Sequence, residues 1–254
     1  MLSKEEKQEL IETPPAWMYE FDLGEGIKTP LLTEELRSIH ATREEMLVTE
    51  IDRCYPKGLH ELDCLDVACN EGYFSQLLYR RGARVKGIDI RPTNIKRAKL
   101  VQQNFGLSPE RLTFELGDFL ELKDPDESYE IVLFLGLLYH LENPMQALRN
   151  LFRLTRRLCV LETQLTRQNT PMVSGWGQSG SFMELPACLA LYQEPDPETN
   201  NLASYHTLSF IPNAAAVRLM LSAAGFQEVV QAVPQPGMNQ QYLLKDRAVF
   251  FAWK

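Results

Sequence analysis

The chain has 254 residues, of which 44% are hydrophobic, and it carries a formal net charge of −8. A chain of this size can bury one large core, or a core with a modest appendage, so we expect a single main domain. No run approaches the roughly 20 apolar residues that span a bilayer, and the charged start MLSKEEKQEL differs from the apolar stretch of a secretion signal, so we expect a cytoplasmic protein without a membrane segment.

The first 59 residues are predicted to form a helical appendage that also covers part of a site. A stretch broken by proline and glycine, TPPAWMYEFDLGEGIKTP, precedes the helical pattern TEELRSIHATREEML.

Residues 60–165 alternate between short apolar strands and amphipathic helices. Such a pattern is typical of a mostly parallel sheet that is covered by helices on both faces. The predicted order is strand 63–69, helix 72–82, strand 84–90, helix 94–106, strands 112–118 and 129–136, helix 143–155 and strand 156–165.

Regularity is lost between residues 166 and 206, where Pro, Gly, Ser and Asn surround isolated aromatic residues. A loop of this length is uncommon unless it covers a site, so we predict a lid. A helix over 213–226 follows, and strands over 227–233 and 247–254 are expected to form a closing hairpin. The predicted fold is α/β and Rossmann-like: a doubly wound, mostly parallel seven-stranded sheet with an antiparallel edge strand, in a domain of residues 60–254 that carries the lid.

The turn Ala68-Cys69-Asn70-Glu71-Gly72 joins the first strand of this sheet to its helix. Ligands of doubly wound sheets bind at the carboxyl ends of the strands, beside the first strand. Three glycines here would admit a pyrophosphate, whereas this turn has one glycine and an added negative charge, so it suits a cofactor without pyrophosphate. Asn tolerates left-handed backbone angles, so Asn70 can replace a turn glycine.

The next two strands end in acids, Asp89 and Asp118. An acid about twenty residues beyond a nucleotide turn commonly accepts hydrogen bonds from ribose hydroxyls, which is the role we predict for Asp89. Asp118 is placed to accept from an adenine amine, with Phe119 or Ile90 against the ring. Either acid taken alone is more often a turn or cap residue.

Five segments of the chain together resemble the class I S-adenosylmethionine-dependent methyltransferase superfamily, over about residues 65–254. They are LDVACNEGYFS, VKGIDI, LTFELGDF, YEIVLFLGLLYHLENP and LCVLET. The resemblance implies S-adenosylmethionine as cofactor and S-adenosylhomocysteine as product. It also implies the cofactor contacts Asp66, Ala68, Asn70, Gly72, Asp89, Ile90, Asp118, Phe119, Leu135 and Gly136.

Within this superfamily, the chain is similar to the branch that contains transfer-RNA wobble-uridine carboxymethyltransferases and small-molecule O-methyltransferases. The segments that carry this finer similarity are FLGLLYHLENPMQAL, LETQLT, LSFIPNAAAVRLMLSAAGF and RAVFFAWK. It implies that Tyr139 and Arg247 face the transferable group. The carboxymethyl enzymes present an upstream lysine to a carboxylated cofactor, and this chain has no lysine between Lys7 and Lys28. We therefore expect ordinary methyl transfer to a hydroxyl of a small or sugar-like molecule, with a tRNA uridine-modifying enzyme as the alternative.

A hydroxyl acceptor benefits from a base whose pKa lies near the working pH. His140, after the fourth strand, is the first candidate, with Glu162 and His206 as alternatives and Tyr139 shaping the methyl pocket. The acceptor side is predicted to be lined by aromatic residues of the two irregular segments, each of which could equally anchor a loop in the core. These residues are Trp17, Tyr19, Trp176, Phe182 and Tyr205, followed by His206.

Other classes of protein remain open on the sequence alone. A nicotinamide-dependent dehydrogenase would need the fuller glycine fingerprint, and a binding protein with a methyltransferase-like fold would explain the missing glycines. The five cysteines form no CxxC pair and the four histidines no metal-binding spacing, so neither disulfides nor a metal are expected. The window 80–99 carries a local charge of +7, with eight basic residues against one Asp, so nucleic acid is a disfavoured partner that is not excluded, and a homo-oligomer is left open.

Overall fold

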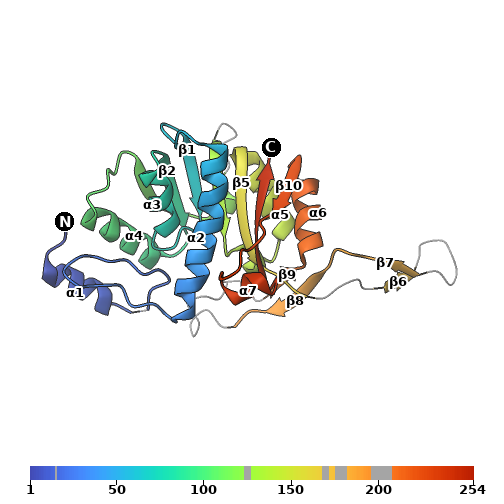
Figure 1. The fold of residues 1–254 in the computed structure, drawn as a ribbon, viewed down its shortest axis with the longest axis horizontal. Coiled ribbons are helices and arrows are strands. Elements are labelled where there is room, and N and C mark those ends of the chain that lie inside the picture. The colour runs from blue at the N-terminus through green and yellow to red at the C-terminus, as the bar shows by residue number, and fades with distance from the viewer. Residues whose placement is uncertain (15, 123–126, 168–171, 175–181, 196–207) are drawn as a thin grey trace.

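The computed structural model describes residues 1–14, 16–122, 127–167, 172–174, 182–195 and 208–254. Its centre is a seven-stranded sheet with the strand order β10-β11-β5-β4-β1-β2-β3 (Figure 1). The strands are β1 (Asp63–Val67), β2 (Arg84–Asp89), β3 (Leu112–Leu116), β4 (Tyr129–Leu135), β5 (Thr155–Gln164), β10 (Glu228–Gln231) and β11 (Arg247–Trp253). This confirms the predicted fold class.

Strand β11 runs antiparallel to both of its neighbours, β5 and β10, whereas β3, β2, β1, β4 and β5 are parallel. The expected closing hairpin is therefore present. Its antiparallel strand lies one position in from the edge, because the last strand of the chain inserts between β5 and β10.

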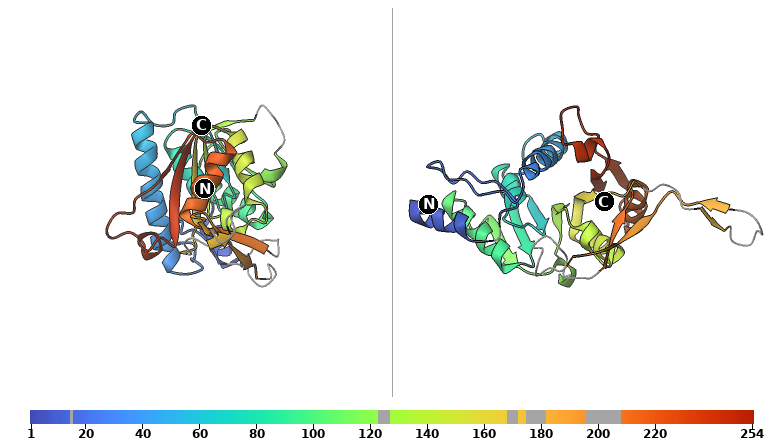
Figure 2. Two further views of the ribbon diagram at one scale, coloured as in Figure 1. Left: turned by 90° about the vertical axis from the view of Figure 1, so that its right-hand side faces the viewer. Right: turned by 90° about the horizontal axis from the view of Figure 1, so that it is seen from below.

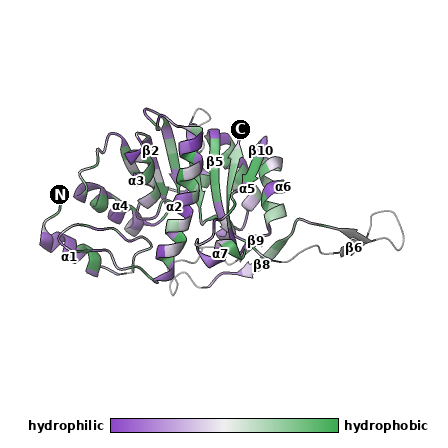
Figure 3. Ribbon diagram, in the orientation of Figure 1, coloured by the Kyte–Doolittle hydropathy of each residue, from purple (hydrophilic) through white to green (hydrophobic). Residues whose placement is uncertain are grey.

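Alternate residues of the strands point into two separate cores. On β4, the side chains of Ile131, Leu133 and Leu135 belong to the core on one face of the sheet. Those of Val132 and Phe134 belong to the core on the other face. Helices α2 (Glu35–Cys54), α3 (Tyr73–Arg80) and α4 (Pro92–Asn104) cover the first face, and α5 (Pro144–Leu154) and α6 (Ala214–Ala224) cover the second (Figure 2). The hydrophobic residues concentrate on the central strands between these layers (Figure 3), as expected for strands buried on both faces.

Local sequence signals account for the starts of these helices. Pro92 and Pro144 occupy the first turn, where the missing N–H costs no helical hydrogen bond. Asn213 caps α6: its side-chain oxygen accepts from the N–H of Ala216 at 2.8 Å. The same helix ends at Gly225, whose φ of 123° few other residues adopt.

The N-terminal residues share the first core with the sheet. Helix α1 (Lys4–Glu12) contributes Leu10, and α2 contributes Met46, Leu47 and Ile51. The division of the chain at residue 59 stays a prediction.

Shorter elements complete the description. They are η1 (Phe119–Glu121), η2 (Leu138–His140), α7 (Gln240–Leu243), and the paired strands β6 (Met172–Ser174) with β7 (Phe182–Glu184) and β8 (Leu189–Gln193) with β9 (Leu208–Pro212). Strands β6 and β7 extend away from the body of the molecule (Figure 1). Much of the predicted lid, 166–206, lies outside the described residues. All five cysteines are free thiols, and none of the helices in the described ranges has the length and apolar character to cross a membrane.

Candidate functional site

A pocket of about 350 Å³ opens at the carboxyl ends of β1, β2 and β4. We call it the site pocket. Of the residues predicted for the site, those that line it are Tyr19, Ala68, Asn70, Asp89, Ile90, Asp118, Phe119, Leu135, Gly136, Tyr139, His140 and Arg247. The prediction of a site at this end of the sheet thus coincides with the cavity.

The turn after β1 holds three residues in left-handed conformation, Ala68, Asn70 and Gly72, with φ of 55°, 51° and 81°. The left-handed angle expected of Asn70 is present. For Ala68 such an angle is unfavourable by about 1–2 kcal/mol, and strain of this kind is typical of functional turns. Gly72 does not line the pocket: a Cβ there would lie 2.5 Å from Cζ of Phe114, so this glycine lets α3 pack on the sheet.

Asp89 ends β2 with its carboxylate fixed between two backbone segments. Its Oδ2 accepts from the N–H of Asn70 at 3.0 Å, and its Oδ1 accepts from the N–H of Arg91 at 2.8 Å and from Nδ2 of Asn94 at 3.2 Å. Burial raises the pKa of Asp89, while these hydrogen bonds oppose that rise. The carboxylate is therefore held in place in the lining of the pocket.

Asp118 and the residues beside it form the far end of the pocket. Asp118 caps η1, its Oδ1 accepting from the N–H of Leu120 at 2.9 Å. Phe119 packs edge-on against Phe134 in the core and is only 4% exposed, whereas Ile90 is 48% exposed. Of the two apolar residues expected against a ring, Ile90 therefore offers more free surface.

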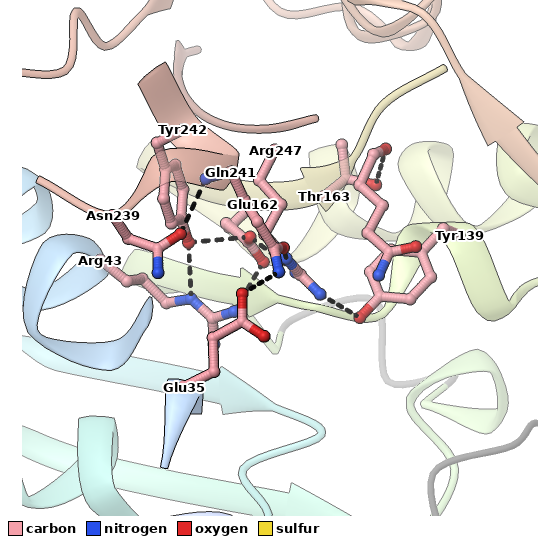
Figure 4. Close-up of polar contacts among 10 residues, drawn as sticks. Glu35, Arg43, Tyr139, Glu162, Thr163, Asn239, Gln241, Tyr242 and Arg247 are labelled. Atoms are coloured by element: carbon pink, nitrogen blue, oxygen red, sulfur yellow. Dashed lines mark hydrogen bonds and ion pairs between the residues drawn. The ribbon is translucent and has the colours of Figure 1, made fainter. Parts of the chain in front are cut away.

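At the opposite end, two arginines surround one buried carboxylate (Figure 4). Glu162 on β5 binds Arg43 of α2 through Oε2 and Arg247 of β11 through Oε1, each at 3.0 Å. Tyr242 donates to the same Oε1 at 3.0 Å. Gly136 lies at the centre of this group: a Cβ there would be 3.7 Å from Arg43, Glu162 and the hydroxyl of Tyr139.

The arrangement corrects the prediction of Glu162 as a general base. The side chain is fully buried and is enclosed by its three partners. Burial alone would raise the pKa of Glu162, but the charges of Arg43 and Arg247 hold it below its ordinary value. Glu162 therefore stays ionised and serves as the counter-ion that keeps both arginines in place.

Arg43 was not identified from the sequence, although it lines the pocket. It supplies a cation on the N-terminal side of the chain, where the sequence has no lysine between Lys7 and Lys28. Nothing in the helical pattern around Arg43 distinguishes it from a solvent-facing residue.

Two histidines line the pocket, and their surroundings differ. The Nδ1 of His140 lies 2.9 Å from Oε1 of Glu194, whose side chain is 2% exposed. The Nε2 of His40 lies 2.9 Å from the carbonyl oxygen of Met18. Burial, reinforced by the charge of Arg43, lowers the pKa of His40 to about 3. Burial also lowers the pKa of His140, but Glu194 opposes that effect.

The negative charge in the turn, Glu71, faces the N-terminal segment and does not line the pocket. Its Oε1 accepts from the N–H of Met18 at 3.2 Å and from Arg97 at 3.3 Å. Arg97 in turn donates to the carbonyl of Thr13 at 2.6 Å and lies 4.4 Å from the ring centroid of Trp17. The turn thus anchors the segment that brings Met18 to the pocket.

This anchoring corrects the prediction of Trp17 as an acceptor contact, because its side chain is fully buried beneath Arg97. Tyr19 does line the pocket, and it stacks on Tyr73 with ring centroids 5.1 Å apart. Asp66 lies behind the pocket, where its Oδ2 accepts from the hydroxyl of Ser75 at 2.6 Å.

The remaining predicted positions, Trp176, Tyr205 and His206, lie outside the described residues, and the side chain of Phe182 is likewise not described. Within the described ranges, no group of His, Cys, Asp or Glu is placed to hold a metal ion.

The family description "Methyltransferase domain" matches residues 65–161. The chain is similar to the ubiquinone biosynthesis O-methyltransferase of Pseudomonas savastanoi pv. phaseolicola, with 32% identity over 99 residues, which are 39% of this chain and 42% of that protein. The chain thus spans less than half the length of the curated relatives it matches.

Solved structures that share the fold include the following two. The N-terminal domain of EvdMO1, in the presence of SAH and D-fucose, has a TM-score of 0.70 at 20% identity, covering 100% of this chain and 97% of that one. Magnesium protoporphyrin IX methyltransferase (ChlM) from Synechocystis PCC 6803, with bound SAM, has a TM-score of 0.56 at 16% identity, covering 91% and 86%.

Proposed function

We propose that the chain is a class I S-adenosylmethionine-dependent methyltransferase that binds S-adenosylmethionine in the site pocket and methylates a hydroxyl group of a small molecule; the match to a methyltransferase domain, the O-methyltransferase relatives and the shared fold support this. The observation that carries this proposal is that Ala68 and Asn70 of the left-handed turn line one pocket together with Asp89 and Asp118. These features suit a nucleoside without a pyrophosphate.

We assign pocket residues to the parts of the cofactor in the order of the strands that carry them. Asp89 would bind the ribose hydroxyls: its Oδ2 accepts one hydrogen bond from the described residues and an ionised carboxylate oxygen can accept two. Asp118 and Ile90 would hold the adenine. Asn70 and Gly136 would flank the methionine portion, where Gly136 leaves the space that a side chain would fill. When bound, S-adenosylmethionine supplies an electrophilic methyl group on a sulfonium, and S-adenosylhomocysteine is the product.

The chain's own contribution to rate would be chiefly to hold the acceptor oxygen in line with this methyl group. His140, which lines the pocket, would receive the hydroxyl proton. The O-methyltransferase relative supports a hydroxyl as the acceptor group. A sugar-like hydroxyl is one candidate within this class, since D-fucose is named with the EvdMO1 domain.

A second candidate is a carboxylated form of the cofactor. The pair Arg43 and Arg247 favours it, because two guanidinium groups share the single carboxylate Glu162 at the methyl end of the pocket. A carboxylate on the donor would balance the second positive charge. The ordinary cofactor remains our proposal, and a direct competition separates the two.

The test is transfer of an isotopically labelled methyl group. Purified protein would be incubated with methyl-labelled S-adenosylmethionine and a panel of catechols, phenolic acids and free sugars that includes D-fucose. We expect one class of compound to gain a labelled methyl ether, with S-adenosylhomocysteine formed in equal amount. Cofactor binding without transfer to any compound would favour a binding protein that lacks catalytic activity.

A further inference from the structure

His140 and Glu194 form a buried pair at the edge of the site pocket. Glu194 follows β8 directly, within the segment predicted to be a lid, and β8 pairs with β9. Strand β9 packs against η2, which carries His140. Two segments that are far apart in the sequence thus meet so that Oε1 of Glu194 lies 2.9 Å from Nδ1 of His140.

The hydrogen bond determines which ring nitrogen carries the proton. An ionised carboxylate is only an acceptor, so Nδ1 must donate, and the neutral ring then keeps its lone pair on Nε2. In the part of the chain that the structure describes, Nε2 has no hydrogen-bond partner. The His140 side chain is 21% exposed and lines the pocket, whereas Glu194 is 2% exposed and does not.

We propose that Glu194 is the positioning residue for His140, fixing the tautomer whose Nε2 faces the acceptor hydroxyl and stabilising the imidazolium that forms there. This inference rests on the proposed transfer to a hydroxyl. In that step the acceptor O–H bond breaks and its proton goes to Nε2, while the oxygen bonds to the methyl carbon. The carbon–sulfur bond breaks with its electron pair remaining on sulfur, which becomes a neutral thioether.

The second pocket histidine provides an internal contrast. His40 contacts a backbone carbonyl, and the charge of Arg43 lowers its pKa more than the charge of Glu162 raises it. Unlike His140, His40 has no hydrogen bond to a carboxylate among the described residues. The charged groups that act on His140 are Glu194, Arg91 and Arg247, and the ring of Tyr139 lies against it at 4.3 Å. Only Glu194 among these is an anion. The pair therefore assigns the base role to His140 and not to His40.

The test uses nitrogen NMR of the histidine rings in the protein labelled at histidine and bound to S-adenosylhomocysteine, with His140 assigned by its loss in His140→Gln. We expect a neutral ring protonated on Nδ1. In Glu194→Gln the amide oxygen can still accept from Nδ1, so the tautomer should persist while the pKa of His140 falls by at least about one pH unit, as expected on losing an adjacent charge. In Glu194→Leu, both the preference for protonation on Nδ1 and the support of the His140 pKa by an adjacent charge should be lost. Glu110→Gln, at an exposed position, is the matched control.

Cofactor binding is measured separately, so that failure of the two proposals can be distinguished. S-adenosylhomocysteine should bind Glu194→Gln within about twofold of the unmodified protein, which also shows that the variant folds. Protonation on Nε2 in the unmodified protein, or an unchanged pKa of His140 in a folded Glu194→Gln, would overturn the inference. If the unmodified protein did not bind S-adenosylhomocysteine, the proposed function would be overturned instead.

Discussion

The backbone N–H of Asn70 donates a hydrogen bond to the carboxylate of Asp89 at 3.0 Å. The turn after β1 and the end of β2 are therefore one unit, and the residue proposed to bind ribose also holds the backbone that flanks the methionine portion. Removing the carboxylate of Asp89 should therefore alter both ends of the cofactor site.

Gly72→Ala should destabilise the protein strongly. A Cβ at this position would lie 2.5 Å from Phe114, and φ is 81°, so the clash adds to the backbone strain. We expect a loss of about 2–4 kcal/mol in the free energy of unfolding, measured in urea. Gly106→Ala is the control, because its φ is 62° but nothing lies within 4 Å. Equal losses in the two variants would show that packing on Phe114 is not the reason for this glycine.

Glu162→Gln separates a structural role from a catalytic one. Removing the shared counter-ion leaves Arg43 and Arg247 buried without a compensating charge, and breaking a buried pair in this way costs about 3–5 kcal/mol. The midpoint of urea unfolding should fall accordingly. A variant that keeps full stability but loses methyl transfer would restore Glu162 as a candidate base.

Asp66 should make stability depend on pH. Burial raises its pKa from 3.8 to about 7, with the hydrogen bond from Ser75 opposing that rise. Between pH 3.8 and about 7, Asp66 keeps its proton in the folded state but has lost it in the unfolded state. The contribution of Asp66 to the free energy of unfolding is therefore fully present below about pH 4 and is lost as the pH rises through about 7. The difference in unfolding free energy between the unmodified protein and Asp66→Asn should shrink over this range. A difference that is constant with pH would mean that Asp66 is ionised in the folded state.

Competition between two donors tests the role of the arginine pair. With ordinary S-adenosylmethionine as the cofactor, Arg247→Gln should not weaken its binding through loss of charge, because the sulfonium and the guanidinium carry charges of the same sign. The carboxylated analogue should compete poorly in the unmodified protein. Preferential binding of the analogue, lost in Arg247→Gln, would reverse the assignment of the donor and favour the transfer-RNA alternative.

Periodicity was enough to predict the sheet and its covering helices, because strands buried on both faces and amphipathic helices have different patterns. Helix α1 was missed, although its capping box is visible as Ser3 and Glu6: Ser3 Oγ accepts from the N–H of Glu6 at 3.2 Å, and the Glu6 carboxylate accepts from the N–H of Ser3 at 2.6 Å. The apolar content of so short a helix gives little signal by itself.

The candidate site was predictable where a residue ends a strand or comes soon after one, as for Asn70, Asp89 and Asp118, because chain order places these positions at one edge. Arg43 and Glu194 could not be found in this way. They reach the pocket from α2 and from the segment after β8, and their positions depend on how those segments pack. The roles predicted for Glu162 and Trp17 were wrong for a similar reason. Chain order placed both near the pocket, but their side chains are buried, which depends on how the segments pack.

Isothermal titration of S-adenosylmethionine and of NAD into the unmodified protein and Asp89→Ala tests the central claim most directly. We expect S-adenosylmethionine to bind and NAD not to bind. The loss of a charged acceptor at Asp89 should weaken binding by about 1.5–3 kcal/mol, or roughly 10- to 150-fold. Asp52→Ala, at an exposed ion pair with Arg81, should bind as the unmodified protein does. Binding of NAD in place of S-adenosylmethionine, or unchanged affinity in a folded Asp89→Ala, would contradict the account.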